Sequence, residues 1–251
     1  VDVGIVTGAN KFFLVNNDVI ENNKLYDYAH PMFGRSDHCP GIIYDEFQHK
    51  KNEESSKPTN FLYFKDSSVE KNKNVKKYLN EGVLEELHTR YKCKIREPWY
   101  SVPSVYKTEI GMLKRCHDAP KLILNEFGAY TTDTAYRIRS SALSSLNLVY
   151  AFINPLSSLC AEIEGRHYGG GVLELVPSEI EELLIPILPD QHISKADLNK
   201  LNALIKSEKM EKVLKDQSNK ILGKVGITRK EQNILLEGWT SLRLRRQRAS
   251  N

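Results

Sequence analysis

The chain has 251 residues, of which 40% are hydrophobic, and a formal net charge of +4. This length suits one large domain, or one domain with a small appendage. The sequence has no apolar run long enough for a membrane span and no signal-peptide pattern, so we expect a cytoplasmic protein that does not interact with a membrane. Because Val1 starts almost inside a predicted strand, we expect a fragment of a longer protein.

The charge is distributed unevenly. Residues 192–251 contain fourteen Lys and Arg against six Asp and Glu, whereas residues 1–191 carry a net charge of −4. A second basic stretch, 90–115, holds seven Lys and Arg against two Glu. Charge gathered in this way can steer a polyanion, although a solvated surface is the simpler explanation for either stretch alone. The four cysteines form no C-x-x-C pair and suit no common zinc spacing, so we expect reduced thiols and no metal.

The chain opens with Gly4, Gly8 and Lys11. Their spacing does not fit a phosphate-binding loop, and Phe12 stands where such a loop needs a hydroxyl. A turn at residues 8–10, between strands over Val3–Thr7 and Lys11–Val15, fits better.

Up to about residue 140 the sequence predicts mainly strands and loops. Helical spacing indicates two short helices, over Val69–Glu81 and Val83–Tyr91, and the polar stretch His49–Pro58 indicates an exposed loop. The remaining strand predictions are Gly41–Tyr44, Asn60–Phe64, Trp99–Val102, Lys121–Asn125 and Ala135–Ile138.

From Ser141 the pattern becomes helical, with one predicted helix ending before Pro155 and another over Leu156–Glu164. Gly169–Gly171 must form a turn, and a strand over Val172–Val176 should follow. After a proline-punctuated extended segment, Ser194 with Asp197 predicts the start of a helix of roughly twenty residues. A capping box at Thr228 and Glu231 predicts the start of the last helix, which ends in a basic tail. We therefore expect an α+β fold with a twisted β-sheet domain over residues 1–190 and a helical C-terminal region over residues 191–251.

No catalytic constellation is present in the sequence. It lacks G-x-S-x-G, H-E-x-x-H and H-x-E…C-x-x-C patterns, and no glycine-rich cofactor loop follows a strand. We therefore predict no catalytic residue in this chain.

Two basic segments suggest another kind of function. If residues 90–100 are extended, Arg90, Lys92, Lys94 and Arg96 point to one face, about 6 to 7 Å apart, which is close to the phosphate spacing along one DNA strand. On the same assumption Tyr100 lies on the basic face and Trp99 on the opposite one, as a core anchor. Arg96 would read a base or pair with Glu97 or another carboxylate.

Arg137 and Arg139 likewise fall on one side of a predicted strand. Each basic segment alone could be solvated surface charge. Both in one chain favour DNA binding.

The sequence resembles the C-terminal target-recognition domain of bacterial adenine-specific DNA methyltransferases. The resemblance covers residues 1 to about 190 and rests on the order of five segments: GIVTGANKFFLV, YKCKIREPWYSVP, PKLILNEFGAYTTDTAYRI, GRHYGGGVLELVPSE and LLIPILPDQ. Similar segments occur in the specificity subunits of multi-subunit restriction systems. The resemblance implies a chain that reads double-stranded DNA, while a catalytic domain N-terminal to it, in cis, binds S-adenosylmethionine and methylates a flipped adenine. Two alternatives remain open, namely a specificity subunit or interaction module acting through a separate methyltransferase or nuclease, and a free-standing enzyme.

The resemblance assigns the turn at residues 7–10, the basic-aromatic segment and the segment around Gly169–Gly171 to the family's signatures. Together with the basic and hydroxyl residues above, these segments give the candidate DNA-binding residues. They are Thr7, Asn10, Lys11, Arg35, Lys92, Lys94, Arg96, Tyr100, Thr131, Thr132, Arg137, Arg139, Arg166 and Tyr168.

Overall fold

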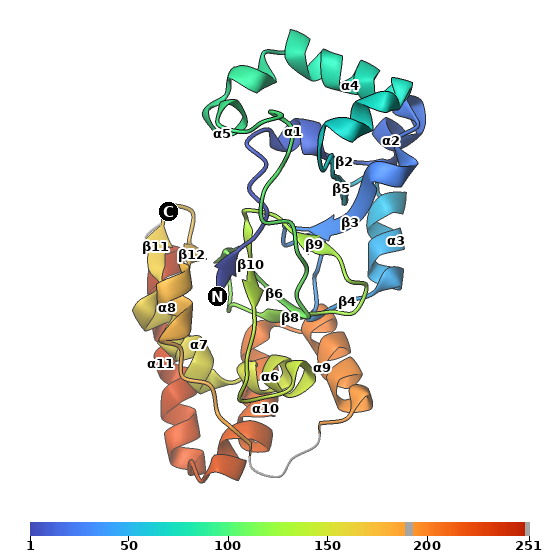
Figure 1. Cartoon of the computed structure of the whole chain (residues 1–251). Coiled ribbons are helices and arrows are strands. Elements are labelled where there is room, and N and C mark those ends of the chain that lie inside the picture. Colours follow the sequence, from blue (N-terminus) through green and yellow to red (C-terminus); the bar gives the residue numbers. More distant parts are fainter. Residues whose placement is uncertain (189–192, 249–251) are drawn as a thin grey trace.

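In the computed structural model, which describes residues 1–188 and 193–248, a five-stranded sheet lies at the centre of the molecule. Its strand order is β1-β10-β6-β8-β4, and every neighbouring pair is antiparallel except β4 with β8. The strands are β1 (Asp2–Val3), β10 (Ala135–Ile138), β6 (Ile110–Leu113), β8 (Leu122–Asn125) and β4 (Ile43–Tyr44). Figure 1 shows this sheet between two groups of elements, one at each end of the molecule.

A second sheet carries the N-terminal group. Its order is β2-β5-β3-β9, from β2 (Leu14–Val15), β5 (Asn60–Leu62), β3 (Ala29–Phe33) and β9 (Tyr130–Thr131). Helices follow between these strands because polar caps start them: Asn16, Asp45 and Asn72 each accept a bond from a main-chain N–H in the first turn. The helices are α1 (Asn10–Phe13), α2 (Asn17–Asn23), α3 (Glu46–Glu54), α4 (Lys73–Leu84) and α5 (Tyr91–Lys94), with 3₁₀ turns η1 (Tyr26–Tyr28), η2 (Ser67–Lys71) and η3 (Leu87–Thr89).

The C-terminal group is mainly helical. It consists of α6 (Ser145–Phe152), α7 (Pro155–Glu164), α8 (Pro177–Glu181), α9 (Lys195–Ser207), α10 (Met210–Ile221), η4 (Leu222–Val225) and α11 (Arg229–Arg248). A small antiparallel sheet, of order β11-β12-β7, lies beside them and comprises β11 (Arg166–Tyr168), β12 (Val172–Glu174) and β7 (Arg115–Cys116).

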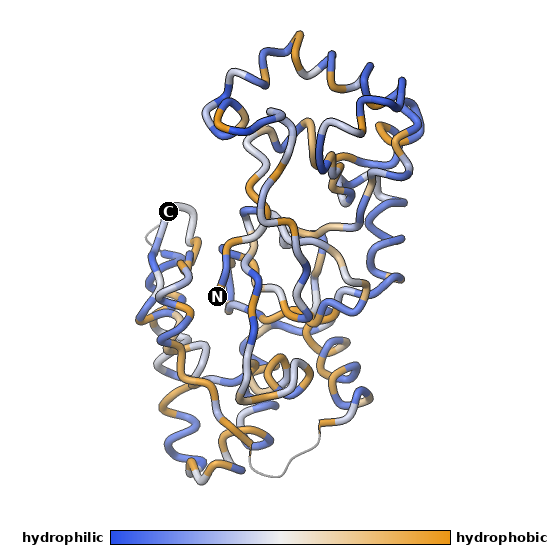
Figure 2. Tube along the Cα trace, viewed as in Figure 1, coloured by the Kyte–Doolittle hydropathy of each residue, from blue (hydrophilic) through white to orange (hydrophobic). Residues whose placement is uncertain are grey.

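Hydrophobic packing follows the same division. One core cluster joins the central sheet to the C-terminal helices and includes Met112, Phe152 and the fully buried Trp239. Another fills the N-terminal group and includes Phe13 and Phe64. Figure 2 shows that α3, at the outer edge of the molecule, is mostly hydrophilic, in keeping with its place outside both cores.

The α+β class and the helical C-terminal region agree with the prediction from sequence. Several elements differ from it. Of the strand predicted over Lys11–Val15 only Leu14–Val15 forms a strand, β2, because Asn10–Phe13 forms α1. Trp99–Val102 is not a strand. Most of the predicted loop His49–Pro58 belongs to α3.

Further differences concern helix boundaries. Only η3 and α5 occur in the second half of the predicted helix over Val83–Tyr91. The helix that starts after Ser194 ends at Ser207, and α10 begins three residues later. The predicted domain boundary at residue 190 lies outside the described residues.

No single helix among the described residues is long and apolar enough to cross a membrane. Helices α6 and α7 reach that length only together, with a bend of 78° between them.

Candidate nucleic-acid interface

The turn near the N-terminus holds α5 in place. The hydroxyl of Thr7 donates to Asn10 Oδ1 over 2.5 Å and accepts from the main chain of Ala9 over 3.1 Å. Gly8 adopts a left-handed φ of +81°, and a Cβ there would lie 2.7 Å from Cβ of Lys92. A residue with a side chain would therefore push α5 away. The turn packs directly against α5.

Arg96, which follows α5, binds the same turn. Its two terminal nitrogens donate to the carbonyls of Thr7 and Val6, each over 2.7 Å. Arg96 forms no salt bridge with Glu97 or another carboxylate among the described residues, and a base contact by Arg96 stays a prediction.

The extended geometry predicted for residues 90–96 is wrong, because residues 91–94 are helical. Lys92 and Lys94 are exposed, but they do not form a row of cations along a strand. The prediction that Tyr100 lies on the basic face and Trp99 on the opposite face depended on the same extended geometry, so it is wrong too. Tyr100 is buried and donates to Glu70 over 2.5 Å, whereas Trp99 is half-buried against Phe12.

A series of three adjoining hollows, which we call the polar groove, runs from α1 across the ends of the two larger sheets. The first hollow, of about 370 Å³, is lined by Asn10, Lys11 and Arg35, and the second, of about 580 Å³, by Arg35, Lys114 and Arg115. The two share Gly34, Arg35 and Thr134. The third, of about 450 Å³, shares Ser36, Leu113 and Arg115 with the second.

Close main-chain packing fixes the loops that form the polar groove. Thr134 Oγ1 donates to the carbonyl of Gly34 over 2.6 Å, and the main-chain N–H of Lys114 donates to the carbonyl of Thr134 over 3.0 Å. A Cβ on Gly34 would lie 2.0 Å from Thr132 Oγ1. Asn10 Nδ2 bonds Asp133 over 3.2 Å, which ties the start of α1 to the same loop. These contacts hold the polar side chains of three segments in fixed positions.

The cations along the groove differ in how strongly they are held. Lys11 is exposed and forms no ion pair within the described residues, while Arg35 pairs with the exposed Asp37 over 3.1 Å. Lys114 and Arg115 both contact Glu174, over 3.1 and 2.5 Å. Although burial raises the pKa of Glu174, hydrogen bonds from these two cations leave it below its usual value.

The β11–β12 hairpin continues this surface. Tyr168 is partly exposed, and Cζ of Arg115 lies 5.7 Å from the centre of its ring. Arg166 is exposed and pairs with Glu179 over 2.7 Å. The predicted turn at Gly169–Gly171 is confirmed, since Gly170 and Gly171 have φ of +78° and +68°.

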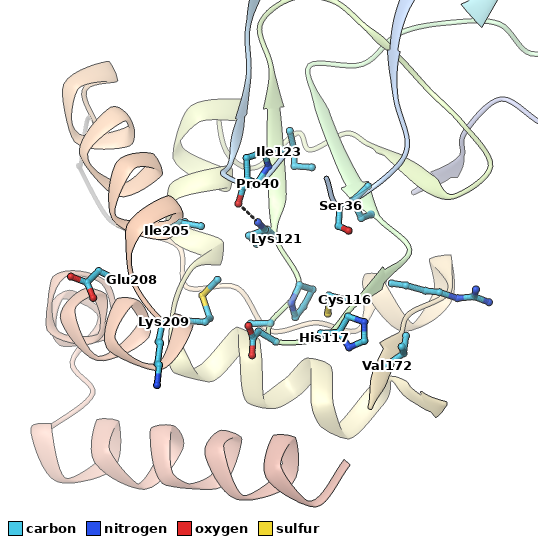
Figure 3. Close-up of a pocket in the computed structure, with 16 residues that line it drawn as sticks. Ser36, Pro40, Cys116, His117, Lys121, Ile123, Val172, Ile205, Glu208 and Lys209 are labelled. Carbon is cyan, nitrogen blue, oxygen red and sulfur yellow. Dashed lines mark hydrogen bonds between the residues drawn. The ribbon is translucent and has the colours of Figure 1, made fainter. Parts of the chain in front are cut away.

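The third hollow lies against the junction of α9 and α10, as Figure 3 shows, with Lys121 and His117 on one side and Ile205 and Lys209 on the other. Lys121 Nζ donates to the carbonyl of Pro40 over 2.6 Å. Burial raises the pKa of the Cys116 thiol to about 12, so this group stays protonated at neutral pH. No group of three or more His, Cys, Asp or Glu in the described residues is arranged to hold a metal ion.

Several predicted site residues have structural contacts instead of a place on the groove surface. Thr7 and Thr131 are buried and line none of the three hollows, whereas Thr132 is buried but lines the first hollow. Arg137 is also buried and donates to the carbonyls of Ser104, over 2.7 Å, and Val3.

Arg139 is exposed but lies outside the polar groove. It pairs with Asp2 over 2.7 Å and lies 5.1 Å from the centre of the Tyr106 ring. Because Asp2 and Tyr106 both engage it, a DNA contact by Arg139 stays a prediction.

Sequence reasoning missed His38, which lines the first hollow. Its side chain is fully buried, and neither ring nitrogen has a hydrogen-bond partner in the described part of the chain. Burial lowers its pKa to about 4, so the imidazole is neutral at physiological pH. No spacing in the sequence marks this residue, because its environment forms from α3 and from loops far along the chain.

The exposed side chains brought together here are cations, an amide and hydroxyls on rigid loops. Such groups suit contacts to phosphates and base edges.

Comparison with known proteins identifies the family of this chain. Residues 1–222 match the family model of the C-terminal domain of the type II methyltransferase M.Eco57I. The chain is 23% identical over 185 residues to the type II methyltransferase M.AccI of Acinetobacter calcoaceticus, covering 71% of this chain and 34% of that protein. The fold is similar to that of the type IIG restriction endonuclease BpuSI, with a TM-score of 0.57 and 14% identity over 93% of this chain and 28% of that one.

The chain thus spans about a third of the length of the methyltransferase that it matches. The match to the family model includes all three sheets and the C-terminal helices as far as α10, and it confirms the resemblance seen in the sequence. The chain belongs to the family of C-terminal domains represented by the type II methyltransferase M.Eco57I.

Proposed function

We propose that this chain recognises a specific sequence in double-stranded DNA, as the target-recognition part of an adenine-specific DNA methyltransferase in a restriction-modification system. The observation that carries the proposal is the polar groove, which Lys11 lines, together with Lys92 and Lys94 on the neighbouring α5. Among the described residues these three cations have no carboxylate partner. Exposed cations without partners are the groups that phosphates would neutralise.

The residues of the groove and of α5 divide into two roles in this proposal. Lys11, Lys92 and Lys94 contact phosphates and set the position of the duplex. Asn10 and Arg35 are exposed at the first hollow and present the amide and guanidinium groups that bind base edges in the major groove. Recognition of sequence therefore depends on Asn10 and Arg35, and affinity for any duplex on the lysines.

The chemical step belongs, in this proposal, to a methyltransferase domain that precedes this chain in the same polypeptide and uses S-adenosylmethionine. The family match and the missing catalytic motifs support that division of labour. We expect no binding of S-adenosylmethionine to these 251 residues in a calorimetric titration. A methylation assay on the full polypeptide, with mapping of the modified base, tests adenine specificity.

Selection of bound duplexes from a randomised pool tests the reading of sequence. We expect enrichment of one short motif by the wild-type chain, loss of at least one position of that motif with Arg35→Ala, and an unchanged motif with weaker binding for Lys11→Ala. Lys51→Ala is the matched control, because Lys51 is also exposed and forms no ion pair among the described residues, but it lies on α3, outside the polar groove. A wild-type chain that binds the pool without enriching any motif would contradict the proposal.

A further inference from the structure

Helix α5 and the residues around it form a projection that the groove does not explain, and we call residues 90–95 the α5 knob. It has two large apolar side chains in water: Tyr91 is 73% exposed and Ile95 is 65% exposed. Exposed apolar groups of this size usually mark a contact surface.

Positive charge surrounds these two side chains. Arg90, Lys92 and Lys94 are exposed, and none of them forms an ion pair within the described ranges. The ammonium of Lys92 lies 5.6 Å from the centre of the Tyr91 ring. A partner for this knob must therefore offer flat apolar faces together with negative charge, which is the combination that stacked bases and phosphates present.

The α5 knob is held firmly, unlike a mobile loop tip. Between the exposed residues, Cys93 is fully buried in the N-terminal core. Arg96 ties the end of the knob to the carbonyls of Val6 and Thr7, and Gly8 packs against Lys92. A side chain held in this way loses little freedom on binding, which favours its use as a wedge.

The position of the knob agrees with this use. It packs on the turn that leads directly into Asn10 and Lys11, the residues that line the first hollow. In Figure 1 the knob and the β11–β12 hairpin project toward the same side of the central sheet. A duplex lying along the polar groove would therefore meet the knob at the end near α1.

We infer that the α5 knob is an aromatic wedge, which inserts Tyr91, supported by Ile95, against a base step of the bound duplex, while Arg90, Lys92 and Lys94 contact the flanking phosphates. The inference rests on the proposed function, since it needs duplex DNA in the groove. It adds a contact that is independent of base identity, because every base offers a π-face.

Binding of a fluorescent duplex of mixed sequence at low salt tests the wedge. We expect Tyr91→Ala to weaken binding by about fivefold or more, and Tyr91→Phe to bind like the wild type, since stacking needs the ring and not the hydroxyl. Tyr26→Ala is the matched control, because Tyr26 is 61% exposed on η1, outside both the knob and the groove, and we expect it to bind normally. Photo-cross-linking to a duplex containing 5-iodouracil should attach the base at Tyr91.

Three results would overturn the inference. If duplex binding persists unchanged in Tyr91→Ala and no cross-link maps to the knob, the wedge is absent while the proposed function stands. If Tyr91→Ala instead dissociates a dimer of the wild-type chain and leaves DNA affinity unchanged, the knob contacts a second copy. If the wild-type chain binds no duplex at all, the proposed function fails together with the wedge.

Discussion

The α5 knob and the end of α11 are both rich in arginine and lysine, yet their charges have opposite roles. At the end of α11, Arg243 pairs with Asp118 over 2.9 Å and lies 4.7 Å from the ring of Trp239, while Arg246 pairs with Glu162 over 2.7 Å. In the knob, Arg90, Lys92 and Lys94 have no such partner among the described residues. Density of charge along the sequence thus does not tell whether a cation stabilises the fold or remains available for a polyanion.

The difference between these two basic regions shows that residues far apart in the sequence determine whether a cation is paired. Glu162 lies 84 positions before Arg246, and the side chains of both are fully buried. The same guanidinium also donates to the carbonyl of Gly171, in the β11–β12 hairpin. Arg246 therefore joins α11 to α7 and the hairpin, whereas Arg245 and Arg248 of the same helix are exposed.

The largest expected effect on stability comes from removing the guanidinium of Arg246. Arg246→Ala leaves the carboxylate of Glu162 buried without its cation, and we expect it to lower the free energy of unfolding by about 3 to 5 kcal/mol. For a chain of this size the melting temperature should fall by roughly 6 to 20 °C. Arg248→Ala, at an exposed position of the same helix, is the control and should melt like the wild type. Equal stability of the two variants would show that the buried pair does not fasten α11.

The next largest effect concerns the bonds by which Arg96 holds the α5 knob against residues 6 and 7. Arg96→Ala removes two charge-assisted bonds to main-chain carbonyls, and we expect a loss of about 2 to 4 kcal/mol in the free energy of unfolding, measured by urea titration. Lys94→Ala, two residues away and exposed, should leave stability unchanged. If Arg96→Ala instead lowers DNA affinity without any loss of stability, Arg96 contacts DNA directly, as the extended geometry had predicted.

A smaller effect concerns the groove and depends on pH. The pKa of His38 is about 4 in the folded protein, below the value near 6.5 of an unfolded histidine, so the unfolded state takes up the proton first. Stability should therefore fall as pH decreases from about 6.5 toward about 4. We expect His38→Gln to flatten this part of the dependence of the urea midpoint on pH, and His117→Gln, at an exposed histidine, to preserve it. An unchanged slope in His38→Gln would assign the dependence to other groups.

Local signals in the sequence predicted part of this fold well. Ser194 with Asp197, and Thr228 with Glu231, start helices as predicted, since each hydroxyl and carboxylate bond main-chain groups three residues apart. Asn154 caps α7 ahead of Pro155 for the same local reason. The positive φ predicted around Gly169–Gly171 also depends only on nearby residues.

Features set by distant residues could not be predicted. The stretch 90–96 has an alternating pattern that fits a strand, but burial of Cys93 and the bonds from Arg96 to residues 6 and 7 favour one helical turn. Of the predicted site residues, Asn10, Lys11 and Arg35 come together in the first hollow, whereas Arg137 and Tyr100 are engaged elsewhere. His38 belongs to the same hollow, but nothing local to it indicates this.

The salt dependence of duplex binding tests most directly whether the exposed cations of the α5 knob, and not those of α11, contact DNA. If the wild-type chain neutralises about five phosphates, the logarithm of its affinity should fall against the logarithm of salt concentration with a slope near −4 to −5. Removing Lys92 and Lys94 together should make this slope shallower by about two, whereas removing Arg245 and Arg248, which are exposed on α11, should leave it unchanged. A slope equally reduced by both double variants, or reduced only by the α11 pair, would contradict the assignment of the α5 knob and polar groove as the DNA-binding surface.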